Sequence, residues 1–325
     1  MDDSRPETER AVTSAMTEID KDERYPTRTE IEFDAEGAKL RGWHYVPEGG
    51  RGSFPTIIMA HGFSAVKEQY LDDYAAAFAA AGLASIVFDN RNFGASAGEP
   101  RQEIDPVQQI RDYRHAVSYA CTLPDVDVDR IGVWGTSYSG GHVLVVAAYD
   151  RRVKCVVSQV PTVSGPEAAL RRTRADLMPG VLAALQADRA DRFEGAAPKM
   201  IKVVTDGDGG PGALAGEDSW QFFMGSRSRA PGWINEVTLR SAEMAREYEP
   251  GSSIHRISPT PLLMIVADHD HVTPTDLALQ AYERALQPKK LVVLKGGHFV
   301  PYVEQFYETS GAAIEWFSEH LFGQR

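Results

Sequence analysis

Three side chains that could together perform acyl transfer lie far apart in the sequence: Ser137, Asp270 and His298. A serine hydroxyl is a poor nucleophile until a neighbouring base takes its proton, and a carboxylate commonly orients that base. We therefore predict Ser137 as the nucleophile, His298 as the base and Asp270 as the orienting acid. Two glycines directly before His298 give its loop the freedom to place the imidazole over the edge of a sheet.

The segment around Ser137 has the pattern of a nucleophile elbow. It reads GTSYSGG (135–141), directly after an apolar stretch and directly before a helical one. In the G-x-S-x-G elbow, small residues on both sides of the serine allow a strained strand-to-helix turn, which projects the hydroxyl above the sheet. Ser139 occupies the second small position in place of glycine. The N-terminus of the following helix would favour the developing negative charge.

Two carboxylates compete for the role of the orienting acid in the segment DHDHVTP (268–274). Asp270 lies one turn before the helix that Pro274 starts, and we predict it as the acid. Asp268 is then expected to cap or brace the loop. The carboxylates and imidazoles of this segment are also metal-ligand types. Because adjacent residues on an extended loop cannot all converge on one ion, no metal site is predicted.

An acyl-transfer site also needs N–H donors for the negative oxygen of the tetrahedral intermediate. The first predicted donor is the backbone N–H of Tyr138, next to the nucleophile. The second is the backbone N–H of Phe63, in the loop HGFS (61–64) after an apolar strand, where Gly62 permits unusual backbone angles. The His61 side chain is expected to brace this loop and not to react.

The pattern of apolar runs predicts the elements that must position these residues. Short apolar strands alternate with helices, which is typical of an α/β fold with a mostly parallel central sheet flanked by helices. The predicted strands are 29–33, 40–46, 55–60, 84–88, 130–134, 153–160, 261–267 and 291–294. The predicted helices are 70–81, 106–121, 140–148, 274–285 and 303–322.

An interruption of this alternation predicts an insertion in the core. We expect an N-terminal arm at 1–28, an α/β core made of 29–160 and 256–325, and a cap or lid insertion at 161–255 with helices near 168–187 and 233–247. A cap with an apolar lining would favour small to medium, mostly uncharged esters or lactones. Four aromatic residues either line such a pocket or form the cap's own small core: Trp220, Phe222, Phe223 and Trp233.

Composition argues against several other classes of protein. The 325-residue chain has a formal net charge of −12, so its surface should repel nucleic acid and anionic lipid. The absence of an apolar leader and of any long apolar run predicts a cytoplasmic protein. The expected partner is a small, ester-like substrate, and no nucleic acid or membrane is expected to bind. Cys121 and Cys155 are expected to be reduced thiols. The composition is compatible with a homo-oligomer and does not require one.

Five segments together resemble the α/β-hydrolase superfamily, and especially its dienelactone-hydrolase-like and prolyl-peptidase-like bacterial members. They are HGFSAVKE (61–68), FDNRNFGASAGEP (88–100), GTSYSGG (135–141), DHDHVTP (268–274) and GGHF (296–299). The resemblance implies an α/β-hydrolase fold, a serine triad, a substrate cleft at the carboxyl edge of the sheet and no cofactor.

We expect such a site to cleave a carboxylic ester or lactone through an acyl-enzyme formed on Ser137. An amide, peptide, thioester or carbon–carbon bond remains an alternative, because the triad would form the acyl-enzyme in the same way. The remaining alternative is a non-catalytic, ligand-binding scaffold, since a fold does not fix a function.

Overall fold

A central sheet of eight strands organises the molecule, with the order β1-β2-β4-β3-β5-β6-β9-β10. The computed structural model describes residues 28–49, 52–206 and 212–323, so almost all of the predicted N-terminal arm lies outside the described residues. The strands from β4 to β10 in this order run parallel, while β2 is antiparallel to both of its neighbours. The strands are β1 (Arg28–Ala35), β2 (Ala38–Tyr45), β3 (Phe54–Ala60), β4 (Ala84–Phe88), β5 (Val126–Thr136), β6 (Val153–Gln159), β9 (Leu262–Ala267) and β10 (Lys289–Leu294).

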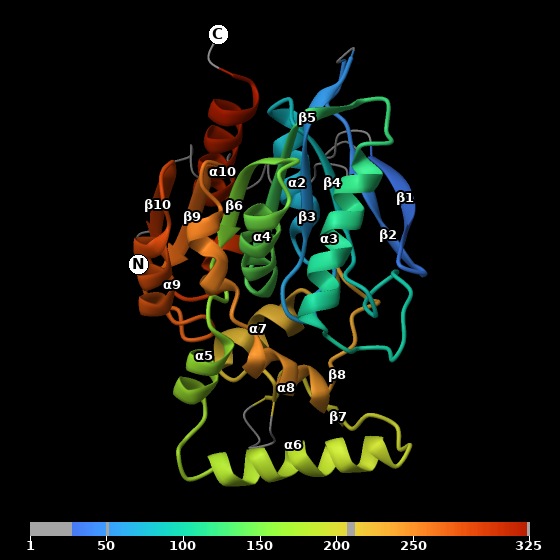
Figure 1. Ribbon diagram of the computed structural model, residues 1–325, viewed down its shortest axis with the longest axis vertical. Coiled ribbons are helices and arrows are strands. Elements are labelled where there is room, and N and C mark those ends of the chain that lie inside the picture. Colours follow the sequence, from blue (N-terminus) through green and yellow to red (C-terminus); the bar gives the residue numbers. More distant parts are fainter. Residues whose placement is uncertain (1–27, 50–51, 207–211, 324–325) are drawn as a thin grey trace, which may run out of the picture.

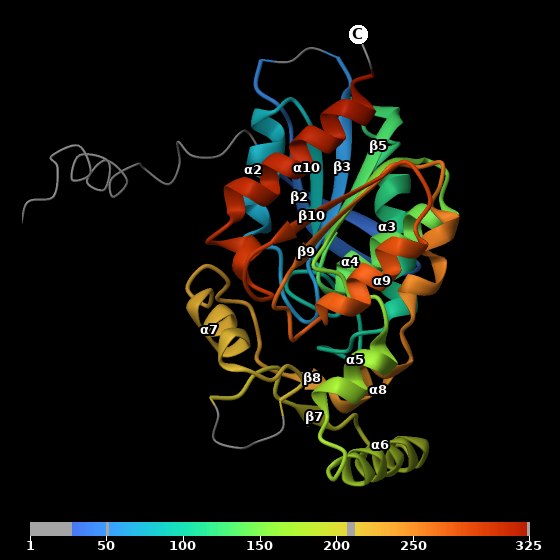
Figure 2. The ribbon, with the colours of Figure 1, turned by 90° about the vertical axis from the view of Figure 1, so that its left-hand side faces the viewer.

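Helices cover both faces of the sheet, as Figures 1 and 2 show. Helices α2 (Leu71–Ala80) and α10 (Phe306–Leu321) pack on one face, and α3 (Pro106–Ala120), α4 (Tyr138–Tyr149) and α9 (Thr275–Arg284) pack on the other. Each face has its own apolar core, because strands covered on both sides bury side chains in both directions. The predicted α/β fold class is confirmed.

Two boundaries of the predicted core elements are wrong. Strand β5 begins at Val126, four residues before the predicted start. Its first four residues include the charged Asp127 and Asp129. Their side chains are not fully buried, so this end of the strand lacks the apolar run on which the prediction depends. The final helix, predicted to begin at residue 303, is α10 and begins only at Phe306, and a separate 3-10 helix, η2 (Val300–Tyr302), lies just before it.

The segment between β6 and β9 forms a layer across the carboxyl ends of the parallel strands (Figures 1 and 2). Helix α6 lies farthest from the sheet in both views. The elements of this layer are α5 (Gly165–Arg172), α6 (Met178–Phe193), β7 (Met200–Ile201), α7 (Glu217–Gly225), β8 (Val237–Thr238), α8 (Leu239–Glu247) and the 3-10 helix η1 (Pro250–Arg256).

Both helices predicted within this layer need correction. The predicted helix 168–187 is two helices, because Thr173 takes an extended conformation that ends α5, and Pro179 lies in the first turn of α6. The predicted helix 233–247 begins only at Leu239. The preceding Thr238 is extended, and its side chain accepts a hydrogen bond from the Ser241 N–H, which caps the start of α8.

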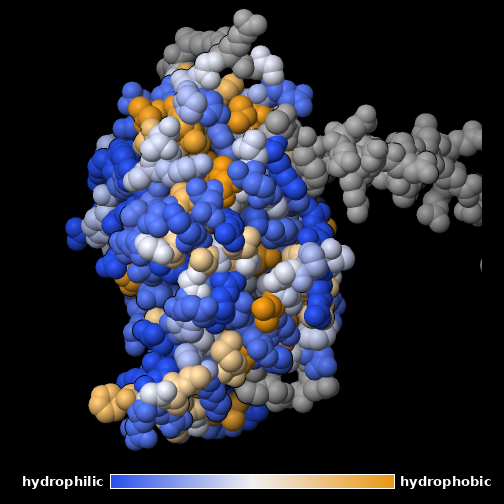
Figure 3. Space-filling model, turned by 90° about the vertical axis from the view of Figure 1, so that its right-hand side faces the viewer, coloured by the Kyte–Doolittle hydropathy of each residue, from blue (hydrophilic) through white to orange (hydrophobic). Residues whose placement is uncertain are grey.

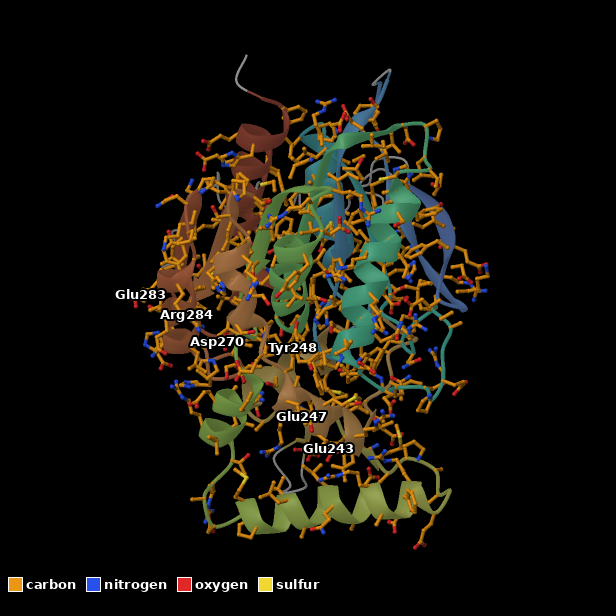
Figure 4. All side chains as sticks on the ribbon, viewed as in Figure 1. Glu243, Glu247, Tyr248, Asp270, Glu283 and Arg284 are labelled. Carbon is orange, nitrogen blue, oxygen red and sulfur yellow. The ribbon has the colours of Figure 1, made fainter. Side chains whose placement is uncertain are left out.

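Polar contacts attach this layer to the core and to itself. The guanidinium of Arg229 pairs with Asp72 at 2.9 Å and Asp73 at 2.8 Å, both at the start of α2. Within the layer, Glu243 projects from α8 toward α6 (Figure 4), where it pairs with Arg189 and Arg192. These contacts fix the layer over the end of the sheet where the predicted site residues lie.

The outer surface is mainly polar. Figure 3 shows one face on which hydrophilic residues predominate and hydrophobic ones are scattered, which is ordinary for a folded domain. Within residues 28–49, 52–206 and 212–323, no helix combines the length and the apolar character that crossing a membrane requires.

Candidate active site

The loops that carry the predicted site residues follow neighbouring parallel strands. Ser137 follows β5, Asp270 follows β9, and His298 follows β10. Phe63 follows β3, the strand beside β5. Because the carboxyl ends of parallel strands meet at one edge, the sheet order brings together residues that are up to 235 positions apart.

The structure places Ser137, His298 and Asp270 in one hydrogen-bonded chain. The Oγ of Ser137 lies 2.9 Å from His298 Nε2, and His298 Nδ1 lies 2.7 Å from Asp270 Oδ2. All three residues are buried, and His298 is only 1% exposed. In the tautomer this geometry favours, the Nδ1–H donates to the carboxylate and Nε2 accepts the serine proton. The arrangement can therefore move a proton from the hydroxyl to the imidazole.

The backbone at Ser137 is strained in the way that an elbow requires. Its φ of 58° and ψ of −117° lie in a region that non-glycine residues rarely adopt. The turn is tight, since a Cβ on Gly135 would lie 2.2 Å from the carbonyl oxygen of Ser139. The Ser139 hydroxyl donates to the His61 carbonyl at 2.5 Å. Ser139, which stands where the motif usually has glycine, thus connects the elbow to the loop after β3 by a hydrogen bond.

Asp270 is the carboxylate that reaches the imidazole, and its other acceptor sites are filled. Its Oδ1 accepts hydrogen bonds from the N–H groups of Val272 and Thr273 at 2.8 and 2.7 Å. Asp268 instead accepts from the Gly296 N–H at 2.8 Å, and this bond, with a contact to His269, lowers the pKa of Asp268. Asp268 braces the two loops against each other.

Thr273 is a site residue that the sequence analysis missed. Its Oγ1 lies 2.8 Å from Asp270 Oδ2, 3.2 Å from His298 Nδ1 and 3.0 Å from the carbonyl oxygen of Val160. The hydroxyl therefore packs against both the acid and the base and holds them relative to β6. Its position three residues after the acid was the available signal, but only the fold shows that β6 ends beside it.

Both predicted oxyanion donors lie at the elbow with their amides unused. No residue in the described part of the chain accepts a hydrogen bond from the Phe63 N–H or the Tyr138 N–H. The loop of Phe63 lies directly against the nucleophile, because a Cβ on Gly62 would be 2.7 Å from Ser137 Cβ and 3.1 Å from its Oγ. Only glycine permits this approach, which leaves two free amides beside the serine hydroxyl.

His61 braces the loop, as the sequence predicts. Its Nε2 lies 2.9 Å from the carbonyl oxygen of Gln69, and its Nδ1 accepts the N–H of Gly62 at 2.8 Å. Burial lowers the pKa of His61 to about 3, so the ring stays neutral and keeps both bonds. The ring also stacks on Tyr302, with 5.6 Å between centroids.

A second buried histidine, His142, lies on α4, the helix behind the nucleophile. Its ring is bonded on both nitrogens, to the Tyr248 hydroxyl at 2.7 Å and to Gln109 Oε1 at 2.9 Å. Burial lowers the pKa of His142 to about 3. Figure 4 shows Tyr248 at the junction between the core and the overlying layer.

We expect the stability of the wild type to fall more steeply in acid than that of a His142→Asn variant. Between a pH of about 6.5 and about 3, the unfolded chain binds a proton at His142 and the folded chain does not, so the free energy of unfolding declines as the pH falls. The wild-type slope should exceed the variant's by about 1.4 kcal/mol per pH unit. Urea unfolding of both proteins at several pH values between 4 and 6 measures the free energy of unfolding and so gives the two slopes. Equal slopes would contradict the prediction, and the exposed His255→Asn serves as control.

A cavity of about 350 Å³ opens beside the nucleophile, between the sheet and the overlying layer. This volume is at the lower end of the range for small-molecule sites. Ser137, Tyr138, Phe63 and Thr273 form its inner end. Its walls come from α5, α6 and α8 and from the segment before α7. They are mostly apolar, including Ala168, Ala169, Leu185, Leu214, Leu239 and Ala242.

The aromatic residues predicted to line the substrate pocket are not part of the wall of this larger cavity. None of Trp220, Phe222, Phe223 and Trp233 borders this cavity. Phe222 and Phe223 border a much smaller recess beside Ser137 and His298, and Phe223 stacks on Trp233 with 5.0 Å between centroids. Trp220 packs against the same apolar cluster. Three of the four are buried, so the alternative prediction, a small core within the overlying layer, describes them better.

Comparison with known proteins identifies relatives over most of the chain. The family model of X-Pro dipeptidyl-peptidase (S15 family) matches residues 36–300. The thiohydrolase aneE of Aspergillus aculeatus is 33% identical over 282 residues, which are 83% of this chain and 86% of that protein. The quorum-quenching protein AidA of Acinetobacter baumannii is 31% identical over 279 residues, covering 86% and 90% of the two chains.

A solved structure shares the whole architecture. The α/β-hydrolase GrgF from Penicillium sp. sh18 superposes with a TM-score of 0.79 at 27% identity, covering 91% of this chain and all of that one. A relative of the same name, the polyketide transferase grgF of Penicillium sp., is 31% identical over 273 residues, 83% of this chain and 89% of that protein. These relatives are thus named as a thiohydrolase, a quorum-quenching protein and a polyketide transferase.

Proposed function

The chain belongs to the S15 family of α/β-hydrolases, and from this we propose that it is a serine hydrolase that cleaves a carboxylic ester or lactone through an acyl-enzyme on Ser137. The single observation that carries the proposal is the hydrogen-bonded chain from Ser137 Oγ through His298 to Asp270. The hydrolase class follows from the family, and the scissile bond and the acyl-enzyme are our proposal.

The proposed reaction begins when His298 Nε2 takes the proton of Ser137 and the serine oxygen attacks the substrate carbonyl. The carbonyl oxygen becomes negative and accepts hydrogen bonds from the free amides of Phe63 and Tyr138. The protonated imidazole then gives its proton to the leaving oxygen, and the acyl group stays on the serine. Water, activated by the same imidazole, releases the acid. Every step uses groups of this chain.

The cavity favours esters over the N-terminal dipeptides in the family's name. A dipeptidyl-peptidase must bind the free amino terminus of its substrate, which is a cation at neutral pH. Among the described residues that line the cavity, three are basic, namely Arg172, Lys199 and Arg246, and none is acidic. Such a cavity would repel an ammonium group close to the nucleophile.

A thioester is the second candidate, because one relative at 33% identity is called a thiohydrolase. The same acyl-enzyme would form, and a thiol is an easier leaving group than an alcohol. No feature of the elbow or of the oxyanion donors separates the two bonds.

Matched substrates that share one acyl group test the proposal. We expect release of the acid from the aryl ester and from the corresponding thioester, and at least about 100-fold slower release from the anilide, because an amide carbonyl is less reactive toward the serine and an amine is a poorer leaving group. A burst of aryl alcohol before the steady state would mark the acyl-enzyme. If folded protein cleaves none of the three, the proposal fails and a ligand-binding scaffold becomes the better account.

A further inference from the structure

The cavity beside Ser137 contains positive charge that the proposed reaction does not use. Arg172 on α5, Arg246 on α8 and Lys199 just before β7 all line it. Over the described residues, none of the three forms an ion pair with an acidic side chain. By contrast, Arg171, the neighbour of Arg172 on the same helix, pairs with Asp276 on the outside.

Arg172 lines the cavity and uses few of its guanidinium donors. The residue is exposed to solvent, and its pKa is lowered by the protein around its guanidinium. Its Nε donates to the carbonyl oxygen of Ala168 at 3.3 Å. For the other guanidinium nitrogens, we find no acceptor among residues 28–49, 52–206 and 212–323. These donors are available to a ligand.

Arg246 lies beside Arg172. The Nη2 of Arg246 donates to the Oγ1 of Thr173, the residue after Arg172, at 3.1 Å. Its Nη1 lies 3.6 Å from the sulfur of Met178. The pKa of Arg172 is lowered first by burial and then by the charge of Arg246, while the Asp270 carboxylate acts in the opposite direction. Guanidinium groups stay protonated in proteins, so two like charges lie close enough to repel, and neither forms an ion pair with a residue of 28–49, 52–206 or 212–323.

We infer that Arg172 and Arg246 bind an anionic group of the substrate, a carboxylate or a similar oxyanion, while the scissile carbonyl lies at Ser137. A planar guanidinium matches a carboxylate with two parallel hydrogen bonds, and a pair of them would bind it from two sides. The anion would also relieve the repulsion between the two arginines. Lys199 adds a third positive charge to the same cavity.

This inference rests on the proposed function and narrows its substrate class. The apolar wall between Ser137 and the arginines suits a short hydrocarbon segment, so the substrate is an ester with a carboxylate a few bonds from the scissile carbonyl. The carboxylate can belong to the acyl group or to the leaving group. The inferred substrate therefore carries a charge, in contrast to the mostly uncharged esters expected from the sequence.

Paired substrates that differ only in charge test the inference. For the acyl side, 4-nitrophenyl monoesters of succinic, adipic and suberic acid are compared with the same esters carrying a terminal carboxamide. For the leaving-group side, the butyrate ester of 4-hydroxybenzoate is compared with that of 4-hydroxybenzamide. In buffer without phosphate or sulfate, kcat/KM should favour the charged member of at least one pair by about tenfold to a hundredfold, as expected for a charge-assisted hydrogen bond.

Variants show whether the two arginines cause the preference. In Arg172→Met and Arg246→Met, the charged-to-neutral ratio of kcat/KM should fall toward one. Arg171→Met, on the same helix but outside the cavity, should keep the wild-type ratio. Circular dichroism checks that each variant is folded, and Arg246→Gln replaces the methionine variant if that one unfolds.

The outcomes separate this inference from the proposed function. Hydrolysis of the neutral esters with no preference for the charged ones would overturn the inference and leave the proposed function standing. If no ester is cleaved, calorimetric titration of suberate into the Ser137→Ala variant still measures the anion site directly. Binding that disappears when Arg246→Met is added supports the site, and the absence of binding overturns it.

Discussion

Replacing Ser137 with alanine is expected to lower kcat for ester hydrolysis by about 10⁶-fold, to a rate near that of residual non-covalent catalysis. The reason is that the acyl-enzyme needs this oxygen, and no other hydroxyl is seen within hydrogen-bond distance of His298 Nε2 among the described residues. A fluorophosphonate probe gives a second measurement, since it should label the wild type at Ser137 and leave the alanine variant unlabelled.

The control for this substitution lies two residues further along the chain. Ser139→Ala removes a hydroxyl that bonds the His61 carbonyl, but that carbonyl keeps the hydrogen bond from Asn90 Nδ2 at 2.8 Å. We expect less than about a tenfold loss of kcat and normal labelling, because one neutral hydrogen bond is worth about 1 kcal/mol. Labelling of the Ser137→Ala variant at another residue would contradict the assignment of the nucleophile.

Replacing Asp270 with asparagine is expected to lower kcat by about 10⁴-fold. The amide has nearly the same shape, but it cannot stabilise the imidazolium, and an NH₂ group facing His298 Nδ1 would favour the tautomer with the proton on Nε2. That tautomer cannot accept the serine proton. Initial rates with an aryl ester measure the effect, and thermal unfolding shows whether the four hydrogen bonds that reach the carboxylate still form.

Asp268→Asn provides the matched control two positions earlier in the same loop. Its carboxylate contacts Gly296 and His269 and does not reach His298. The expected loss of kcat is below about tenfold, since the change affects only an exposed brace. If Asp268→Asn abolished activity and Asp270→Asn did not, the assignment of the orienting acid would be wrong.

The sequence was most informative where a local pattern has a single structural solution. The GTSYSGG segment predicts the elbow because only small residues fit such a turn, and the structure shows the strained Ser137 and the crowded Gly135. The buried strands were predictable from their apolar runs, since a strand covered on both faces needs nothing else.

Features that depend on tertiary packing could not be predicted from the sequence. Thr273 acquires its role only because β6 ends beside it, and Arg172 and Arg171 are indistinguishable until α5 is placed over the sheet. The overlying layer was the least predictable part. Its helices are short and mostly exposed, so their boundaries depend on caps and extended residues such as Thr173 and Thr238 more than on apolar periodicity.

The position of α6 has a consequence for how this enzyme scaffold can change. The helix supplies Val181, Ala184 and Leu185 to the cavity wall, yet it stands apart from the sheet and buries few of its residues. Substitutions along it would therefore alter which molecules are accepted, at little cost in folding and without displacing the reacting groups. Substitutions on this one peripheral helix can thus change substrate choice, in evolution or in protein engineering, while the fold and the reacting groups stay the same.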